Sequence, residues 1–126
     1  MSVSELPVAL VLALALLAPV SAEAPATVTI INVSNYRFTP KPIQLAGGRP
    51  ITITFVNQAG GGHDFTAKEF FAASTIMAGA APDGKISLAP HETKSITLAP
   101  RAGTYEAHCS HFLHASMGMT DEIVVS

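Results

Sequence analysis

The sequence predicts an all-β fold, a Greek-key β-sandwich of about seven short strands with one short helical insertion. Runs rich in β-branched residues recur along the chain, with clusters of Gly, Pro or Asn between them. Residues 27–33 (TVTIINV) form the first such run. Residues 51–56 (ITITFV) alternate apolar side chains with Thr, which is typical of a strand buried on one face. Many short strands separated by turn residues favour a sandwich of two sheets.

The other strands follow in order along the chain. Pro40 and Pro42 interrupt the extended residues around them, so residues 36–45 are predicted to form an edge or a crossover rather than a central strand. The later strands are each bounded by turn residues and are predicted at residues 63–66, 85–88, 92–98, 104–109 and 122–125.

Residues 67–80 (AKEFFAASTIMAGA) have a different pattern. Apolar side chains recur there at spacings that suit an amphipathic helix. The segment is therefore predicted to be a helix that covers one side of the β-structure, with Phe70, Phe71 and Met77 in the core.

The first residues are predicted to be a secretion signal. Residues 8–20 (VALVLALALLAPV) are an unbroken apolar run, shorter than the about 20 residues that span a bilayer. Val20-Ser21-Ala22 has small residues where a signal peptidase prefers them. We expect residues 1–22 to be cleaved and residues 23–126 to form one periplasmic or secreted domain, with no stable membrane insertion. No Lys or Arg precedes the run, so an uncleaved anchor or a buried apolar helix is the alternative.

Charge and composition exclude some classes of partner. The chain has nine acidic residues, of which Glu5 lies in the predicted signal, against seven Lys and Arg. The charges of the remaining domain nearly cancel and form no basic stripe, so nucleic acid is not expected as a partner.

The single cysteine, Cys109, cannot form an internal disulfide. In an oxidising compartment it must be buried, paired with another chain or bound to a metal.

The densest group of chemically active residues lies at 105–119 (YEAHCSHFLHASMGM). Thiolate and imidazole ligands suit copper or zinc, and a thioether adds a preference for copper. Blue-copper sites take two His and one Cys in a plane, with a weak axial Met. Cys109, His114 and Met119 have the spacing C-x4-H-x4-M, and a neighbouring strand would supply His63, which follows three glycines.

Two segments resemble the cupredoxin family of blue copper proteins. Residues 57–65 (NQAGGGHDF) are similar to the family's loop that carries the first His ligand, and residues 103–125 to its ligand loop and last strand. The spacing of the ligand loop is similar to that of rusticyanins and plantacyanins. The resemblance implies one copper ion bound by His63, Cys109, His114 and Met119.

Two alternatives for these ligands remain open. His111 is the rival of His114, and Met117 is the rival of Met119. The resemblance favours His114 and Met119. In the family, the residue four positions after the axial Met is apolar and lies on the last strand, and Ile123 holds that position after Met119. His108 precedes Cys109 on a strand and should point to the opposite face.

The function that we expect is electron transfer by an exported mononuclear type 1 copper protein, cycling between Cu(I) and Cu(II) with a redox partner protein. The alternative is a periplasmic carrier or chaperone in copper homeostasis that delivers copper to an acceptor, which the extra His108, His111 and Met117 would suit. An enzyme is not expected, because the chain has no second metal site and the axial position of the first is filled. Zinc is the alternative metal, although a Met ligand would be unusual for it.

Overall fold

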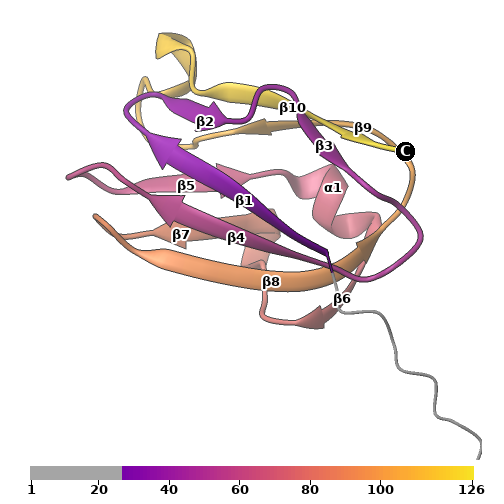
Figure 1. Ribbon diagram of the computed structural model, residues 1–126. Coiled ribbons are helices and arrows are strands. Elements are labelled where there is room, and N and C mark those ends of the chain that lie inside the picture. Colours follow the sequence, from indigo (N-terminus) through magenta and orange to yellow (C-terminus); the bar gives the residue numbers. More distant parts are fainter. Residues whose placement is uncertain (1–26) are drawn as a thin grey trace, which may run out of the picture.

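The computed structural model describes residues 27–126. The predicted signal, residues 1–22, and its cleavage site lie outside the described residues. Within the described part, ten strands pair into two five-stranded sheets that enclose a hydrophobic core (Figure 1). The predicted all-β sandwich is confirmed. No helix of residues 27–126 reaches the length and apolar character that crossing a bilayer requires.

The two sheets have the following spatial orders. The first sheet contains β2 (Arg37–Thr39), β1 (Thr27–Ser34), β4 (Ile51–Asn57), β8 (Thr93–Pro100) and β6 (Ser74–Ala78). The second sheet contains β3 (Ile43–Leu45), β10 (Thr120–Val125), β9 (Gly103–His108), β5 (His63–Thr66) and β7 (Lys85–Leu88).

The strand count exceeds the predicted seven by three strands, β2, β3 and β6, all of which lie at sheet edges. β2 and β3 have three residues each and β6 has five. β2 is an edge of the first sheet and β3 is an edge of the second, with Pro40 and Pro42 between them. The prediction of an edge or crossover at the two prolines is therefore confirmed, and the missing amide hydrogens of Pro are tolerated there.

The helical segment is shorter than the sequence predicts. Helix α1 spans only Lys68–Ala72, and Ser74–Ala78 pairs with β8 as an edge strand. The β-branched Thr and Ile of this segment fit a strand, and the ladder hydrogen bonds offered by β8 override a weak helical preference. Phe70 and Phe71 are buried as predicted, but Met77 is exposed on the edge strand rather than packed in the core.

The core consists of inward-facing side chains from both sheets. Along β4, buried and half-buried residues alternate as the pleat requires. At the centre of the core lies Phe65, whose ring centroid is 5.2 Å from that of Phe38, 4.9 Å from that of Phe55 and 6.2 Å from that of Phe71. Because Phe65 belongs to β5, this aromatic packing fixes the strand that begins at His63.

Loops from distant parts of the sequence meet at one end of the sandwich (Figure 1). β5 begins at His63, β9 ends one residue before Cys109, and β10 begins one residue after Met119. The Cys109 amide donates to the Met119 carbonyl oxygen at 3.1 Å, which continues the β9–β10 pairing and closes the intervening loop. The ends of three neighbouring strands thus hold the residues predicted as ligands.

Candidate metal centre

Cys109 lies in the interior, immediately after β9. Its side chain is 1% exposed. The backbone N–H of Asp64 donates to its Sγ at 3.4 Å, so the sulfur has a fixed partner on β5. Burial raises the pKa of the Cys109 thiol, because a thiolate is poorly solvated in the interior. A bound cation would compensate for the cost of the thiolate charge.

His63 is buried at the start of β5 and points one ring nitrogen toward that sulfur. Its Nδ1 lies 3.9 Å from the Cys109 Sγ. Its Nε2 lies 2.9 Å from the side-chain oxygen of Asn35, and an amide oxygen can only accept a hydrogen bond. The Nε2 therefore carries the hydrogen, and Nδ1 keeps its lone pair. Burial, followed by the nearby His114 and His111, lowers the pKa of His63, which favours the neutral, metal-binding imidazole.

His114 supplies the second imidazole from the loop between β9 and β10. Its Nδ1 lies 3.5 Å from the Cys109 Sγ, and its ring centroid lies 4.8 Å from that of His63. The residue directly precedes a short 3-10 helix, η3 (Ala115–Met117). One donor atom from each of His63, Cys109 and His114 forms a group in which all three atoms lie within 4.8 Å of one another.

Met119 and its rival Met117 occupy different environments. Met119 is fully buried, whereas Met117 on η3 is 56% exposed. Met119 is also joined through its backbone to two other predicted ligands: its N–H donates to the His114 carbonyl oxygen at 3.1 Å and its carbonyl oxygen accepts from Cys109. The loop therefore turns Met119 inward and leaves Met117 at the surface.

His111, the rival of His114, lies on the outside of the same cluster. Its side chain is 44% exposed, and its Nε2 lies 3.6 Å from the Asp64 Oδ2. Its ring stacks on that of His114, with centroids 5.3 Å apart and planes inclined by 16°. With Asp64 and Cys109 it forms a second group of donor atoms within 4.8 Å of one another. The two groups share Cys109.

His108, the remaining His of residues 105–119, lies outside the cluster. His108 is exposed while Ala107 and Cys109 on either side of it are buried, so it points away from the cluster. The prediction that His108 faces the opposite side of the strand is confirmed, because neighbouring strand residues alternate between faces.

Asp64 ties β5 to the loop that follows Cys109. Its Oδ1 accepts from the Thr66 hydroxyl at 2.6 Å and from the Ser110 N–H at 2.9 Å, and its Oδ2 accepts from the Ser110 hydroxyl at 2.6 Å. Burial acts to raise the pKa of Asp64, but the hydrogen bonds from Ser110 and Thr66 outweigh it and hold this pKa below its usual range. The carboxylate thus links Thr66 on β5 to Ser110, the residue that follows Cys109.

Two residues of the β1–β2 turn support the cluster, and no motif in the sequence marks them as functional. Asn35 holds His63 through the hydrogen bond described above. The Tyr36 ring packs edge-on against that of His114, with centroids 4.9 Å apart. Both residues lie far from the ligand loop in sequence, and a polar residue followed by Tyr in a turn has no distinctive spacing.

Comparison with known proteins agrees with this architecture. A family model described as the cupredoxin-like domain matches residues 7–125. No curated protein matches the sequence. Among solved structures, reduced auracyanin from the photosynthetic bacterium Roseiflexus castenholzii has a TM-score of 0.61 at 22% identity, covering 82% of this chain and 99% of auracyanin. Auracyanin B has a TM-score of 0.59 at 21% identity, covering 85% of this chain and 94% of that protein.

A larger protein also contains this fold. A multicopper oxidase from Campylobacter jejuni matches with a TM-score of 0.63 at 13% identity, over 98% of this chain but 35% of the oxidase. At such identities, the three solved structures establish the likeness of fold. The family model covers nearly the whole chain, and on that ground the protein belongs to the cupredoxin-like domain family.

Proposed function

We propose that this chain is an exported copper protein of the mononuclear type 1 class, and that it carries single electrons to or from a redox partner protein. The supporting observation is the convergence of the Cys109 sulfur with one ring nitrogen each of His63 and His114 within 4.8 Å. Export rests on residues 1–22 acting as a cleaved signal. Neither nucleic acid nor a chemical substrate is part of this proposal.

The donor set fits copper. One thiolate and two imidazoles, with the buried thioether of Met119 on the same loop, are softer ligands than the oxygen atoms that calcium or magnesium prefers. A thioether is also unusual in structural zinc sites. His63, Cys109, His114 and Met119 would hold one copper ion per chain, which would supply one-electron exchange between its Cu(I) and Cu(II) states.

The protein's own contribution is to hold these side chains in place. Asn35 orients His63, the Asp64 N–H holds the Cys109 sulfur, and Tyr36 packs on His114. Side chains fixed by such partners keep their geometry when the charge at the centre changes, and this lowers the cost of gaining or losing an electron. The buried positions of His63, Cys109 and Met119 also exclude water from that side of the centre.

The loop surface offers apolar side chains to a partner. Phe112 is 86% exposed and Leu113 is 57% exposed. Large apolar side chains that are exposed next to one another often mark a site of interaction with another protein. We expect a redox partner to contact Phe112 and Leu113 near His114.

The test is the spectrum of the copper-loaded protein. We would add one equivalent of Cu(II) to the purified protein and to Cys109→Ala, and record visible absorption and electron paramagnetic resonance. An intense thiolate-to-copper charge-transfer band in the wild type, absent in the variant, would support the proposal. A colourless wild-type protein that binds copper without thiolate coordination would refute it.

Matched variants assign the other ligands. His114→Ala and Met119→Leu should change the band and the paramagnetic parameters strongly. His111→Ala and Met117→Leu should leave both nearly unchanged. The reverse pattern in either pair would reassign that ligand to the rival residue.

Copper carriage is the second candidate function, and the position of His111 favours it. Its ring stacks on His114, and its donor group with Asp64 shares Cys109 with the first group. Such overlapping donors could pass a metal ion outward to an acceptor. Rapid loss of Cu(I) to a competing chelator, slowed in His111→Ala, would favour carriage. Tight retention through repeated reduction and oxidation would favour electron transfer.

A further inference from the structure

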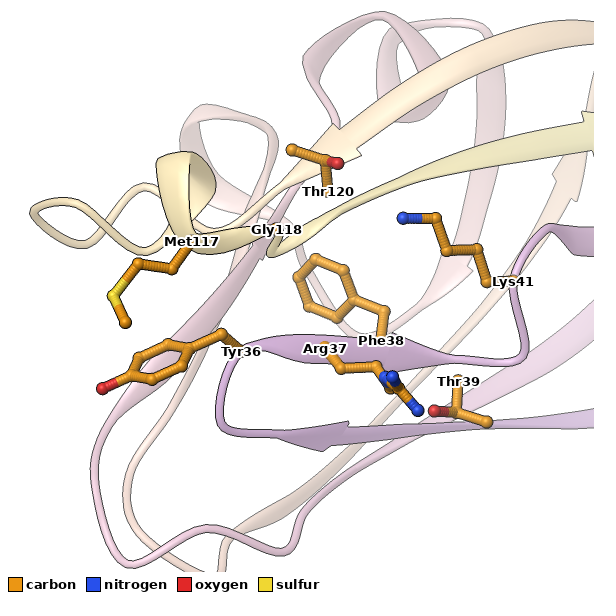
Figure 2. A pocket seen from close by; sticks show the side chains of 8 residues that line it. All are labelled: Tyr36, Arg37, Phe38, Thr39, Lys41, Met117, Gly118 and Thr120. Atoms are coloured by element: carbon orange, nitrogen blue, oxygen red, sulfur yellow. The ribbon is translucent and has the colours of Figure 1, made fainter.

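A groove beside the ligand loop runs between the β1–β2 region and the start of β10, and its lining includes Met117 but none of the four predicted ligands. Its volume is about 520 Å³. Figure 2 shows the residues that line it. Tyr36, Arg37, Thr39 and Lys41 come from the β1–β2 turn, β2 and the segment after it, and Gly118 and Thr120 come from the start of β10 and the loop before it.

The two charged side chains that line the groove, Arg37 and Lys41, are both cationic. Arg37 and Lys41 are both exposed, and neither forms an ion pair within the described residues 27–126. Asp121 lies close enough to Lys41 for their charges to interact, but Asp121 is buried and does not line the groove. Thr39 and Thr120 are exposed and can add hydroxyl donors. Two cations and two hydroxyl groups around one groove are complementary to carboxylates.

The groove is also in contact with the candidate metal centre. Tyr36 lines it, and the same ring packs against His114 with centroids 4.9 Å apart. Tyr36 also lies 6.3 Å, centroid to centroid, from His63. A group bound in the groove would therefore be separated from two predicted ligands by one aromatic ring.

We propose that this groove docks a carboxylate-rich segment of the redox partner, with Arg37 and Lys41 as the charges that recognise it and Tyr36 as the contact to His114. The electron-transfer role of the groove rests on the proposed function, whereas its binding of carboxylates does not. The apolar side chains of Phe112 and Leu113 do not line this groove. The partner would thus be held by charge on one side of the ligand loop and by apolar contact elsewhere on it.

The first experiment measures binding and needs no copper. A hexaglutamate peptide is titrated into the ¹⁵N-labelled protein, with hexalysine as the peptide of opposite charge. We expect hexaglutamate to shift the amide signals of Arg37, Thr39, Gly118 and Thr120. The variant R37Q/K41Q should bind about tenfold more weakly, an effect in the range of charge complementarity at a protein surface.

A matched variant separates local recognition from net charge. Arg49 and Lys94 are exposed and do not line the groove. R49Q/K94Q therefore removes the same number and kind of charges elsewhere, and it should bind hexaglutamate like the wild type. Equal loss in the two double variants, or no binding by the wild type, would overturn the proposal.

The second experiment tests electron transfer through the groove. The reduced protein loses one electron to hexacyanoferrate(III), which becomes hexacyanoferrate(II); the comparison oxidant is the cation tris(phenanthroline)cobalt(III). R37Q/K41Q should lower the rate of oxidation by the anionic oxidant about tenfold. It should not lower the rate of oxidation by the cationic oxidant. Tyr36→Leu should slow the anionic oxidant while Tyr36→Phe retains the rate, because Phe keeps the ring on His114.

The two experiments fail in distinguishable ways. If hexaglutamate binds but R37Q/K41Q leaves the anionic rate unchanged, the electron-transfer role of the groove is overturned and a carboxylate site alone remains. If the protein holds no reducible copper, the proposed function fails together with that role. In that case the peptide titration still decides whether the groove recognises carboxylates.

Discussion

Asp64 is the residue whose replacement should reveal how the ligand loop is held to the sheet. Its carboxylate is buried and accepts three hydrogen bonds, from the Thr66 hydroxyl and from the N–H and hydroxyl of Ser110. Asp64→Ala leaves these three donors without their acceptor. Asp64→Asn keeps one oxygen but places an amide NH₂ where the other oxygen was, and it removes the charge.

The magnitude follows from the number and environment of these bonds. A hydrogen bond to a charged group contributes about 1.5–3 kcal/mol. Ser110 is exposed, so water can replace part of its loss, whereas Thr66 is buried. We therefore expect Asp64→Ala to lower the free energy of unfolding by about 3 kcal/mol, less than the sum of three bonds. For Asp64→Asn we expect about 1 kcal/mol, since neutral bonds are roughly half as strong.

The assay is urea denaturation of the metal-free protein at pH 7, followed by circular dichroism. Asp83→Asn is the matched control, because Asp83 is exposed in a turn at φ 58° and Asn tolerates that backbone conformation. It should change the free energy of unfolding by less than about 0.5 kcal/mol. If both Asp64 variants unfold at the same urea concentration as the control, the reasoning is refuted.

The same carboxylate makes the stability of the metal-free protein pH-dependent. The pKa of Asp64 in the folded protein lies below its usual value, which the unfolded chain retains. Its contribution is thus present above the unfolded pKa and is lost as the pH falls through the folded pKa. The difference between wild type and Asp64→Asn should shrink below about pH 4. A difference that grows on acidification would contradict the assigned sign.

Three further predictions test other parts of the structure. Asn35→Ala removes the oxygen that holds the His63 ring; NMR of the imidazole nitrogens should show a smaller fraction of the Nε2–H tautomer, and an unchanged fraction would contradict this role. Phe65→Ala should cost about 3–5 kcal/mol of unfolding free energy, measured by urea denaturation, because the ring is 1% exposed among three other Phe rings. Gly84→Ala should cost about 1–3 kcal/mol more than Gly48→Ala. Both glycines have positive φ, 71° at Gly84 and 75° at Gly48. A Cβ at Gly84 would lie 2.7 Å from the Cα of Lys68, the first residue of α1, whereas nothing lies within 4 Å of a Cβ at Gly48. Equal losses of unfolding free energy in the two variants, measured by urea denaturation, would contradict the clash.

The sequence predicted those features that depend on neighbouring residues. The alternation in residues 51–56 is sufficient to indicate a strand with one buried face, and β4 has that pattern. Cys109, His114 and Met119 lie within eleven residues, from the end of one predicted strand to just before the next, so their proximity follows from chain connectivity. Their roles as copper ligands, and the signal at residues 1–22, stay predictions.

Pairing between distant segments was decided by the tertiary structure. Residues 74–78 have a helical spacing of apolar side chains, yet they form β6 because the edge of β8 is there to pair with them. That edge is formed by residues about twenty positions further along the chain, beyond the reach of a local pattern. The placement of Met77 at the surface follows from the same pairing.

The contacts that hold the candidate site in place also join segments that are distant in the sequence. His63 meets Cys109 across 46 positions, and Asn35 meets His63 across 28. The sequence by itself determined which residue types are present and which of them one short loop must bring together. Only the packing of the two sheets decided that the β1–β2 turn, with Asn35 and Tyr36, lies against that loop, because contacts between distant segments depend on how the whole core closes.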